Sequence, residues 1–384
     1  MLPEDGKHEL SNRCVELVSL ASGLAGRVHP TLRASIGDLV RSMNCYYSNL
    51  IEGHDTHPIS IDRALAGDYS KDPEQRNLQL EARAHIEVQR MIDHGEAPEP
   101  VVSRAFLQWV HYEFCRRMPE ELLIAGEDKD GKPVKVIPGE FRRQLVKVGR
   151  HIPIDADDVP AFLARFEQAY DPSRLSKVEA ITAAAAAHHR LLWIHPFLDG
   201  NGRVARLFSH ALLRHLGVGS ELWSVSRGLA RSKETYKQLL MAADADRRGD
   251  LDGRGHLTMA GLQEFCAYFL DQGIDQVKFM EGLMEPRELL RRMEIWTEEE
   301  TRAKRLPKGS WQLLREAVVG GSFPRGRAAE ITGYEERQAR TVLGALLDLG
   351  VLVSPGPRTP VRLGFPATVL ERWLPLLYPA MPSR

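Results

Sequence analysis

The chain has 384 residues, 43% of them hydrophobic, which is enough to bury a core in each of two or three domains. Its 51 basic and 52 acidic residues nearly cancel, so no global field draws the protein to nucleic acid or to a membrane. The four cysteines lie far apart without a CxxC pair, which argues against a zinc site and a disulfide framework and favours a reducing compartment.

The start of the chain, MLPEDGKHEL, is charged where a signal peptide would be apolar. No apolar run in the sequence reaches the roughly eighteen residues that a membrane-spanning helix needs. We therefore expect a cytoplasmic protein without a membrane partner.

The first distinctive segment in chain order is SNLIEGHD, residues 48–55. A serine, a glutamate four residues later and then a glycine are typical of a helix that ends at Gly53. Considered alone, the segment predicts nothing more than this helix terminus.

Helical periodicity dominates the rest of the chain. Apolar residues recur at three- and four-residue spacing over ten or more positions in 77–95, 178–194 and 256–280. Helices therefore form the main body of the protein, and the predicted fold class is mainly α. Residues 128–154 are the exception, because glycines and prolines interrupt short valine-rich stretches there, as in hairpins and loops.

The sequence DKDG at 128–131 has two interpretations. It is similar to the opening of a calcium loop, but the sequence after it lacks the remaining ligands and the closing glutamate of an EF-hand. We therefore favour a plain turn over a calcium site.

The segment HPFLDGNGRVAR, residues 195–206, has the composition of an anion-binding loop. Asp199-Gly200-Asn201-Gly202 requires conformations that glycine and asparagine accept easily, so the chain turns tightly and directs successive N–H groups to one point. The following residues have helical spacing, which places this turn at a helix N-terminus where the macrodipole also favours negative charge. Arg203 and Arg206 are three residues apart on that helix, and two guanidinium groups beside an anion site indicate more than one phosphate.

Two further side chains of this segment complete a nucleotide site. The carboxylate of Asp199 can hold Mg²⁺ beside a polyphosphate, because this ion keeps most of its waters and takes one or two protein oxygens. His195 titrates near neutrality and can take a proton from an incoming hydroxyl. The residues thus predict a Mg-nucleotide site with a general-base histidine. The alternative, a capped helix–loop–helix with surface arginines, would require many fixed residue types to coincide by chance.

The C-terminal part of the chain has the element order of a winged helix-turn-helix. Residues 281–307 are charged and form the expected linker helix, and 308–384 follow as helix, short helix, turn, longer helix and two short strands. The predicted recognition helix covers 335–349. This helix and the wing offer Arg337, Gln338, Arg340, Arg358 and Arg362 to phosphates or bases. Because Glu335 and Glu336 stand at the same helix start, DNA binding and protein docking stay open as alternatives.

The 195–206 segment resembles the signature of the Fic family, HxFx(D/E)GNGRxxR, at every fixed position. The resemblance runs from about Cys45 to about Phe279 and includes SRGLARSKETYKQLL after the motif. It implies a helical Fic fold with a small β-hairpin flap, and an enzyme that transfers AMP from Mg-ATP to a Ser, Thr or Tyr hydroxyl of a target protein. The expected organisation is an N-terminal helical region at 1–100 with an inhibitory helix at about 44–53, a Fic core at 101–280, a linker helix at 281–307 and the winged helix-turn-helix at 308–384.

The resemblance also implies a role for each residue of the motif. His195 would be the catalytic base, Asp199 the metal ligand and Phe197 an anchor in the core. Arg203 would reach the β-phosphate of ATP and Arg206 the γ-phosphate. The expected nucleotide-binding residues are Gly200, Asn201, Gly202, Arg203, Val204, Ala205, Arg206 and Tyr236, with a core aromatic as the alternative for Tyr236.

Beside such a motif, SNLIEGHD resembles the family's inhibitory helix, [S/T]xxxE[G/N]. Ser48, Glu52 and Gly53 occupy the matching positions. Glu52 would pair with Arg206 and remove the arginine that should hold the γ-phosphate, so that ATP binds in a posture unsuited to in-line attack. The inhibition would act within one chain.

Residues 139–154 resemble the Fic flap, a hairpin that pairs with the backbone of the target segment. Side-chain alternation along this stretch predicts an exposed strand, with an ordinary hairpin as the alternative. The expected target-binding residues are Val146, Lys147, Val148 and Gly149. His188 and His189, in the alanine-rich helix before the motif, are expected to pack or lie at the surface rather than bind a metal.

Two other functions stay open at this point. The same residues can serve the removal of AMP from a modified protein, with Glu52 positioning water, or transfer from another nucleotide donor. The second alternative is a DNA-binding regulator whose Fic domain only senses nucleotide, although a sensor needs no base such as His195. The expected partners are ATP and a protein substrate, with the chain itself as one candidate, and the oligomeric state is open between monomer and homodimer.

Overall fold

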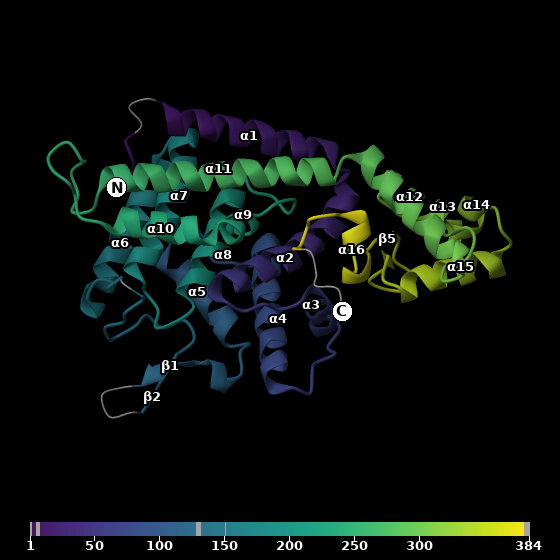
Figure 1. Cartoon of the computed structure of the whole chain (residues 1–384), viewed down its shortest axis with the longest axis horizontal. Helices are drawn as coiled ribbons and strands as arrows, with labels where there is room; N and C mark the ends of the chain where they lie inside the picture. Colours follow the sequence, from purple (N-terminus) through teal and green to yellow (C-terminus); the bar gives the residue numbers. More distant parts are fainter. Residues whose placement is uncertain (1, 5–7, 128–131, 150, 380–384) are drawn as a thin grey trace. The chain divides into compact units, whose positions relative to one another are not determined.

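The computed structural model describes residues 2–4, 8–127, 132–149 and 151–379. Helices make up most of this part of the chain and the few strands are short, which confirms the predicted fold class (Figure 1). The chain divides into two compact units. The first comprises residues 1–22 and 44–277, and the second comprises residues 23–43 and 278–384.

These units differ from the predicted organisation in the N-terminal part. Residues 44–100 belong to the same unit as most of the predicted core, so they do not form a region of their own. Residues 23–43 group instead with the C-terminal residues. The difference arises because two long helices, α1 (Glu9–Arg27) and α2 (Pro30–Glu52), each contribute residues to both units.

The other elements of the first unit are helices and one short hairpin. They are α3 (Pro58–Leu65), α4 (Pro73–Asp93), α5 (Arg104–Cys115), β1 (Ile124–Glu127), β2 (Pro133–Lys135), α6 (Val159–Tyr170), α7 (Lys177–Ile194), α8 (Asn201–His215), α9 (Ser226–Arg231), α10 (Lys233–Asp244) and α11 (Met259–Leu283), whose last residues lie in the second unit. Throughout the described residues, every helix is too short or too polar to span a bilayer. The four cysteines are buried, and in the part of the chain that the structure describes they form no disulfide.

Helix α7 is buried along most of its length and leads into the 195–206 segment. It begins with a capping box, in which the Ser176 hydroxyl accepts from the Glu179 amide at 3.3 Å and the Glu179 carboxylate accepts from the Ser176 amide at 2.8 Å. The alanines at 183–187 are at most 1% exposed, and α6 and α8 pack against this helix. Because alanine side chains are small, the neighbouring helices approach closely and restrict the end of α7.

The two histidines of α7 are buried packing residues, which is one of the two predicted alternatives; the other placed them at the surface. The Nδ1 atom of His188 hydrogen bonds with the Ser209 hydroxyl and its Nε2 atom with the Tyr236 hydroxyl, both at 2.7 Å. His189 Nε2 lies 3.0 Å from a carboxylate oxygen of Asp244. Elsewhere in the described ranges too, no group of three or more His, Cys, Asp or Glu side chains is placed to hold a metal ion.

The hairpin of the first unit lies earlier in the chain than the sequence predicts. Strands β1 and β2 pair antiparallel, with Ile124 opposite Lys135. The strand predicted within 139–154 is wrong, because the described residues there form no regular strand and contain a single bridge. The turn predicted at 128–131 lies outside the described residues.

The missing strand has a physical cause in the side chain of Arg142. Its guanidinium donates to the backbone carbonyls of Gln144 at 3.1 Å and Ile154 at 2.5 Å. The carbonyls of Gln144 and Ile154 therefore accept from the Arg142 side chain instead of from the backbone amides of a partner strand, as they would in a β-ladder. The described residues of this stretch keep one β-bridge, between Val148 and His151.

The second unit ends in a small three-stranded sheet with helices. Its elements are α12 (Pro286–Arg302), α13 (Ser310–Val319), β3 (Ser322–Phe323), α14 (Ala328–Thr332), α15 (Glu336–Asp348), β4 (Leu352–Val353), β5 (Val361–Leu363) and α16 (Ala367–Trp373). The strand order is β3-β5-β4, and both pairs are antiparallel. The left-handed Gly333, at φ 69°, makes the turn between α14 and α15. The order α13, α14, α15, β4 and β5 agrees with the predicted one, and α15 lies at the position of the predicted recognition helix, but β3 and α16 are additional elements. The winged helix-turn-helix therefore stays a prediction.

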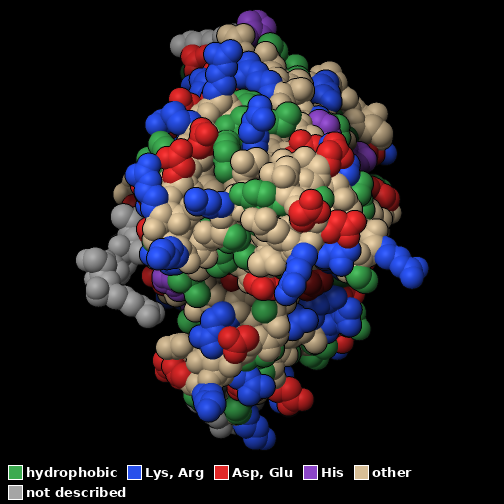
Figure 2. All heavy atoms as spheres, turned by 90° about the vertical axis from the view of Figure 1, so that its right-hand side faces the viewer, with side chains coloured by type: hydrophobic (Ala, Val, Ile, Leu, Met, Phe, Trp, Pro, Cys, Tyr) green, Lys and Arg blue, Asp and Glu red, His purple; other side chains and the backbone are tan. Residues whose placement is uncertain are grey.

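One predicted nucleic-acid contact in this unit has another partner. Arg362 donates to the Ser35 hydroxyl at 2.7 Å and forms an ion pair with Asp38 at 2.7 Å. Its role as a phosphate contact is therefore corrected to an internal one, because its guanidinium already has an anionic partner. Arg337 and Arg340 are exposed, and Arg340 pairs with Glu336 at 2.9 Å. Figure 2, which views the right-hand side of Figure 1, shows basic and acidic side chains interspersed on this face.

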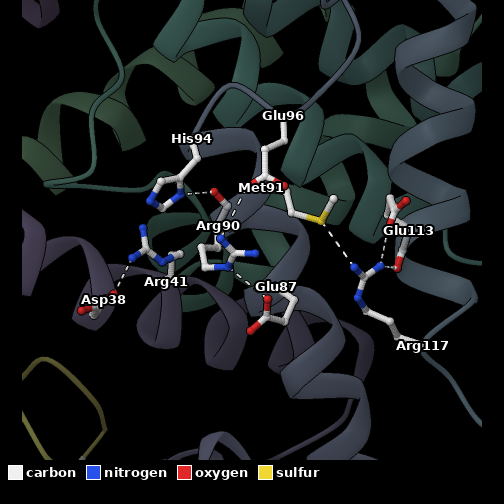
Figure 3. A network of polar contacts seen from close by, with 9 residues as sticks. All are labelled: Asp38, Arg41, Glu87, Arg90, Met91, His94, Glu96, Glu113 and Arg117. Atoms are coloured by element: carbon white, nitrogen blue, oxygen red, sulfur yellow. Dashed lines mark hydrogen bonds and ion pairs between the residues drawn. The ribbon is translucent and has the colours of Figure 1, made fainter. Parts of the chain in front are cut away.

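Polar contacts tie α4 to the end of α5 in the first unit (Figure 3). Arg90 pairs with Glu87 at 3.0 Å, and its carbonyl hydrogen bonds with the His94 ring at 2.7 Å. Arg117 pairs with Glu113 and contacts the sulfur of Met91 at 3.4 Å. Partly exposed pairs of this kind contribute about 0–1 kcal/mol each, so we assign them to helix packing rather than to a site. A further ion pair in this view, between Asp38 and Arg41, belongs to the other unit.

Candidate active site

The loop between α7 and α8 begins and ends on left-handed residues. His195 closes α7 with φ 51° and ψ 62°, and Gly200 precedes α8 with φ 78°. A histidine at positive φ is uncommon and is retained only where the surroundings impose it. The loop therefore has a defined conformation at its first residue, and its last residue is a glycine that accepts the same region without strain.

Side chains of the loop itself hold it closed. The Asn201 side chain accepts from the Phe197 amide at 3.0 Å and donates to the Phe197 carbonyl at 2.9 Å. Phe197 is fully buried and stacks on His111 with ring centroids 4.0 Å apart, so it anchors the loop in the core as predicted. Both polar atoms of the Asn201 side-chain amide are thus engaged with Phe197. An anion can therefore be bound by the backbone N–H of Asn201 rather than by its side chain.

His195 has the hydrogen bonding of a general base. Its Nδ1 atom lies 3.3 Å from the Leu192 carbonyl, an acceptor that assigns the ring proton to Nδ1 and leaves Nε2 as a proton acceptor. Burial, assisted by the nearby His151 and Arg142, lowers the pKa of His195 to about 4. The imidazole is therefore neutral at pH 7.

A cavity of about 1180 Å³ opens beside this loop. It is lined by the end of α2, the β1–β2 hairpin, residues 144–148 and the loop with the start of α8. The motif residues that line it are His195, Leu198, Asp199, Gly200, Asn201, Gly202 and Arg203. The helix N-terminus directs amide groups and a positive dipole end to this space, which is the environment that an anion requires.

Arg203 is nearly buried between two carboxylates. It forms an ion pair with Glu81 of α4, lies 3.6 Å from Asp199, and its guanidinium is 5.1 Å from the ring centroid of Phe114. Glu81 is 2% exposed and also accepts from His54 Nδ1 at 2.8 Å. This hydrogen bond raises the pKa of His54. The buried carboxylate of Glu81 thus positions both Arg203 of α8 and His54, which lies two residues after the end of α2.

Arg206 is held by the end of α2. It is 2% exposed, its Nε atom donates to the Ser48 hydroxyl at 2.8 Å, and its Nη2 atom lies 2.5 Å from a carboxylate oxygen of Glu52. Burial favours the neutral acid, but Arg206 and Arg203 outweigh it and hold the pKa of Glu52 below its ordinary value. The Glu52 carboxylate is therefore charged at neutral pH.

Gly202 makes room for the Glu52 carboxylate. A Cβ atom at position 202 would lie 2.3 Å from the Glu52 Oε1 atom, far inside contact distance. Helix α2 ends at Glu52, and Gly53 follows with φ 98°, which confirms the helix terminus predicted from SNLIEGHD. The glycines at 53 and 202 thus permit the close approach of an acid to the start of α8.

The model of the Fic/DOC family matches residues 102–213, which include the whole loop and most of α8. These residues therefore form a Fic/DOC domain. The chain's matches among characterised proteins include the protein adenylyltransferase Fic of Drosophila erecta, 44% identical over 79 residues, and that of Drosophila ananassae, 43% identical over 79 residues. Each match covers 21% of this chain and 16% of the relative.

Solved structures share the Fic fold at low sequence identity. A Fic family protein from Desulfovibrio desulfuricans superposes with a TM-score of 0.54 at 18% identity, covering 94% of this chain and 98% of its own. Fic-1 from C. elegans (residues 134–508) gives 0.52 at 17% identity and covers 71% of each chain. These likenesses show the fold.

Several expected residues of the Fic domain lie outside the cavity lining. They are Ser48, Gly53, Gly149, Val204, Ala205, Arg206 and Tyr236. Tyr236 is 2% exposed and bonded to His188, so the structure favours the core alternative over contact with a base. Val146, Lys147 and Val148 do line the cavity, although they form no strand.

Sequence reasoning missed three buried polar residues around the Fic motif: Glu81, His111 and Arg142. The His111 ring stacks on Phe197 and accepts from the Gly139 amide at 2.8 Å, so it joins the loop to the segment before the cavity. Burial lowers the pKa of His111 to about 4, which keeps it neutral. A weak signal existed for Glu81, because it stands beside Ala82 in a periodic helical segment. The other two carry no local signal.

Proposed function

We propose that the chain is a protein adenylyltransferase that transfers AMP from ATP to a hydroxyl group of a target protein. The observation that carries the proposal is the cavity in which a neutral His195 and the N-terminus of α8 line the same space. A proton acceptor beside an anion site is the combination that nucleotide transfer to a hydroxyl needs. The names of the Drosophila relatives support the same reaction.

The proposed step uses His195 as the base. Its Nε2 atom takes the proton of a Ser, Thr or Tyr hydroxyl, whose oxygen attacks the α-phosphorus of ATP. The bond from that phosphorus to the bridging oxygen breaks, and diphosphate leaves. The amides at the start of α8 and the guanidinium of Arg203 stabilise the negative charge on the phosphates. Residues 144–148 also line the cavity, and a target segment can dock there.

Asp199 fits a magnesium ion that arrives with ATP. Its side chain is 54% exposed and lines the cavity, and Mg²⁺ commonly takes one or two protein carboxylates while phosphates and waters supply the other ligands. When bound, the ion would neutralise part of the triphosphate charge. The Arg203 guanidinium lies 3.6 Å from this carboxylate.

We further propose that Glu52 inhibits this activity within the chain. The Arg206 guanidinium has three hydrogen bonds to the end of α2, two to Ser48 and one to Glu52. Because these donors of Arg206 are occupied, fewer of them are available to the γ-phosphate, and ATP binds without the alignment that in-line attack requires. Removal of the Glu52 carboxylate is the change that would free it.

A reverse reaction has one observation in its favour. The Glu52 carboxylate lines the same cavity as His195, where it is placed to orient a water molecule. In that case the wild-type chain would release AMP from a modified protein, and the variant without Glu52 would not.

The proposed transferase activity is tested by comparing which phosphate of ATP, the α- or the γ-phosphate, becomes attached to protein. The Glu52→Gly chain, incubated with a cell lysate and Mg²⁺, should add label to protein from α-labelled ATP and no label from γ-labelled ATP beyond that of the same lysate without the chain. Chelation of the metal with EDTA should stop the labelling. Release of free AMP without labelled protein would show a nucleotidase instead of a transferase.

For the C-terminal part we propose protein docking rather than DNA binding. Arg362 is already paired with Asp38, Arg340 with Glu336, and the start of α15 is acidic. We expect the full chain to show no shift of DNA duplexes in gels at low salt. Salt-sensitive binding that disappears in the Arg337→Ala/Arg340→Ala chain, but persists in a matched Arg291→Ala/Arg302→Ala chain, would establish DNA binding instead.

A further inference from the structure

Arg142 lies immediately behind the catalytic loop and is 3% exposed. In the described part of the chain its guanidinium forms no ion pair, and each of its hydrogen bonds ends on a backbone carbonyl. The Nε atom donates to the His195 carbonyl at 2.7 Å, and Nη2 donates to Ile194 at 3.4 Å and Ile154 at 2.5 Å. The Nη1 atom donates to Gln144 at 3.1 Å.

Two of these carbonyls belong to the C-terminus of α7. The last carbonyls of a helix lack partners within the helix and carry the negative end of its dipole, so a buried cation is stabilised there without a carboxylate. The backbone amide of Arg142 adds a hydrogen bond to the Pro196 carbonyl at 2.9 Å. Arg142 therefore restrains three successive residues, 194–196, at the point where the chain takes the left-handed conformation of His195.

The other two carbonyls bracket the segment that forms the wall of the cavity. Gln144 and Ile154 stand near the two ends of the stretch that contains the lining residues 144–148. The planar guanidinium is the side chain suited to this geometry, because its donors point in fixed directions to several acceptors at once. A lysine ammonium keeps the charge but cannot hold four carbonyls in these positions.

We propose that Arg142 is a positioning residue that fixes the base His195 and the target-docking segment 144–148 relative to each other. The inference rests on the proposed transferase function. Among the described residues, Arg142 is not part of the cavity lining, and its side-chain hydrogen bonds end on residues 144, 154, 194 and 195 rather than on α8, so it acts on the target hydroxyl and its base rather than on ATP.

The test compares Arg142→Lys with Arg165→Lys, an exposed arginine of α6, both in the Glu52→Gly chain. Arg142→Lys should lower kcat/KM for the protein target roughly 10- to 100-fold, the loss expected from a small misplacement of reacting groups. The KM for the target should rise and the KM for ATP should stay within about twofold, and Arg165→Lys should match the parent chain. A change that only lowered the amount of folded protein would leave both KM values unaltered.

Two readouts without activity separate this inference from the proposed function. Hydrogen exchange at 144–154 should be faster in Arg142→Lys than in Arg165→Lys, even where no chain labels a target. In the unsubstituted chain, the Nε–H of Arg142 should exchange slowly in NMR spectra, because it is buried and bonded to His195. Unchanged kinetics together with unchanged exchange at 144–154, or a rapidly exchanging Nε–H, would overturn the positioning role.

Discussion

His195→Ala should abolish most AMP transfer while the fold and the affinity for ATP remain. Removal of a general base typically lowers a rate by roughly two to four orders of magnitude. The ATP site keeps its affinity because the start of α8 and Arg203 are untouched by the change. Labelling rates of the Glu52→Gly chain with and without His195→Ala give the comparison, and ATP affinity is measured by calorimetry. His256→Ala, at an exposed position in a loop, is the matched control.

The pH profile is the second readout of the same base. Because the pKa of His195 lies at about 4, the neutral form that accepts a proton predominates at every pH above about 5. The labelling rate should therefore stay level from pH 7 to about pH 5 and fall below it, as protonation removes the base. A rate that already halves near pH 6.5, the value of an unperturbed histidine, would show that burial does not control this group. Near wild-type labelling by His195→Ala would remove the residue from the mechanism.

The central loop could be predicted from the sequence because its determinants are local. Gly200 takes a left-handed conformation and α8 begins directly after it, as the order of the residues in 195–206 requires. The apolar Phe197 in a polar segment correctly indicated an anchor in the core. Each of these features depends on residues within one or two turns of each other, where steric and hydrogen-bonding rules act directly.

The charged partners of the loop could not be found in the same way. Glu81 and Arg203 are 122 positions apart, and a glutamate on an amphipathic helix is normally read as solvent-exposed. Their pairing is created by the packing of α4 beside α8. Glu52 and Arg206 are 154 positions apart, and from the residues alone the segment around Glu52 predicts only a helix terminus. The resemblance to a family motif, rather than a physical pattern, pointed to that pair.

The wrong strand in 139–154 shows where side-chain alternation fails. Alternating apolar and polar residues describe a strand only if the backbone finds a partner strand. Here the backbone of Gln144 and Ile154 is bonded to a buried arginine, and the hairpin forms at 124–135 instead. Arg142 also appears in the sequence as one of two adjacent arginines, which gives no sign that it is buried while Arg143 is 88% exposed.

Glu52→Gly should increase self-labelling and target labelling relative to the wild-type chain. A hydrogen bond between charged groups contributes about 1.5–3 kcal/mol, which corresponds to roughly a 10- to 100-fold gain when the competing contact is removed. The Glu52 side chain is 33% exposed, so solvent screening favours the lower end of this range. Glu52→Gln, which keeps the size but loses the charge, should fall between the two. Equal labelling by wild type and Glu52→Gly would contradict the inhibitory assignment.

Arg206→Ala tests whether the gain passes through the contact seen in the structure. If Glu52 inhibits by occupying Arg206, then the two substitutions are coupled, and Glu52→Gly should increase labelling strongly in the wild-type background and little in the Arg206→Ala background. If Glu52 instead blocks the cavity that it lines, the increase should be similar in both backgrounds, because Arg206 lies outside the lining. The four labelling rates of this cycle separate the two mechanisms, provided that each chain shows the same far-UV circular dichroism and a cooperative thermal transition.

The Arg206 guanidinium also donates to the Ser48 hydroxyl. Ser48→Ala should therefore increase the labelling rate less than Glu52→Gly does, because it removes a neutral acceptor and leaves the carboxylate in place.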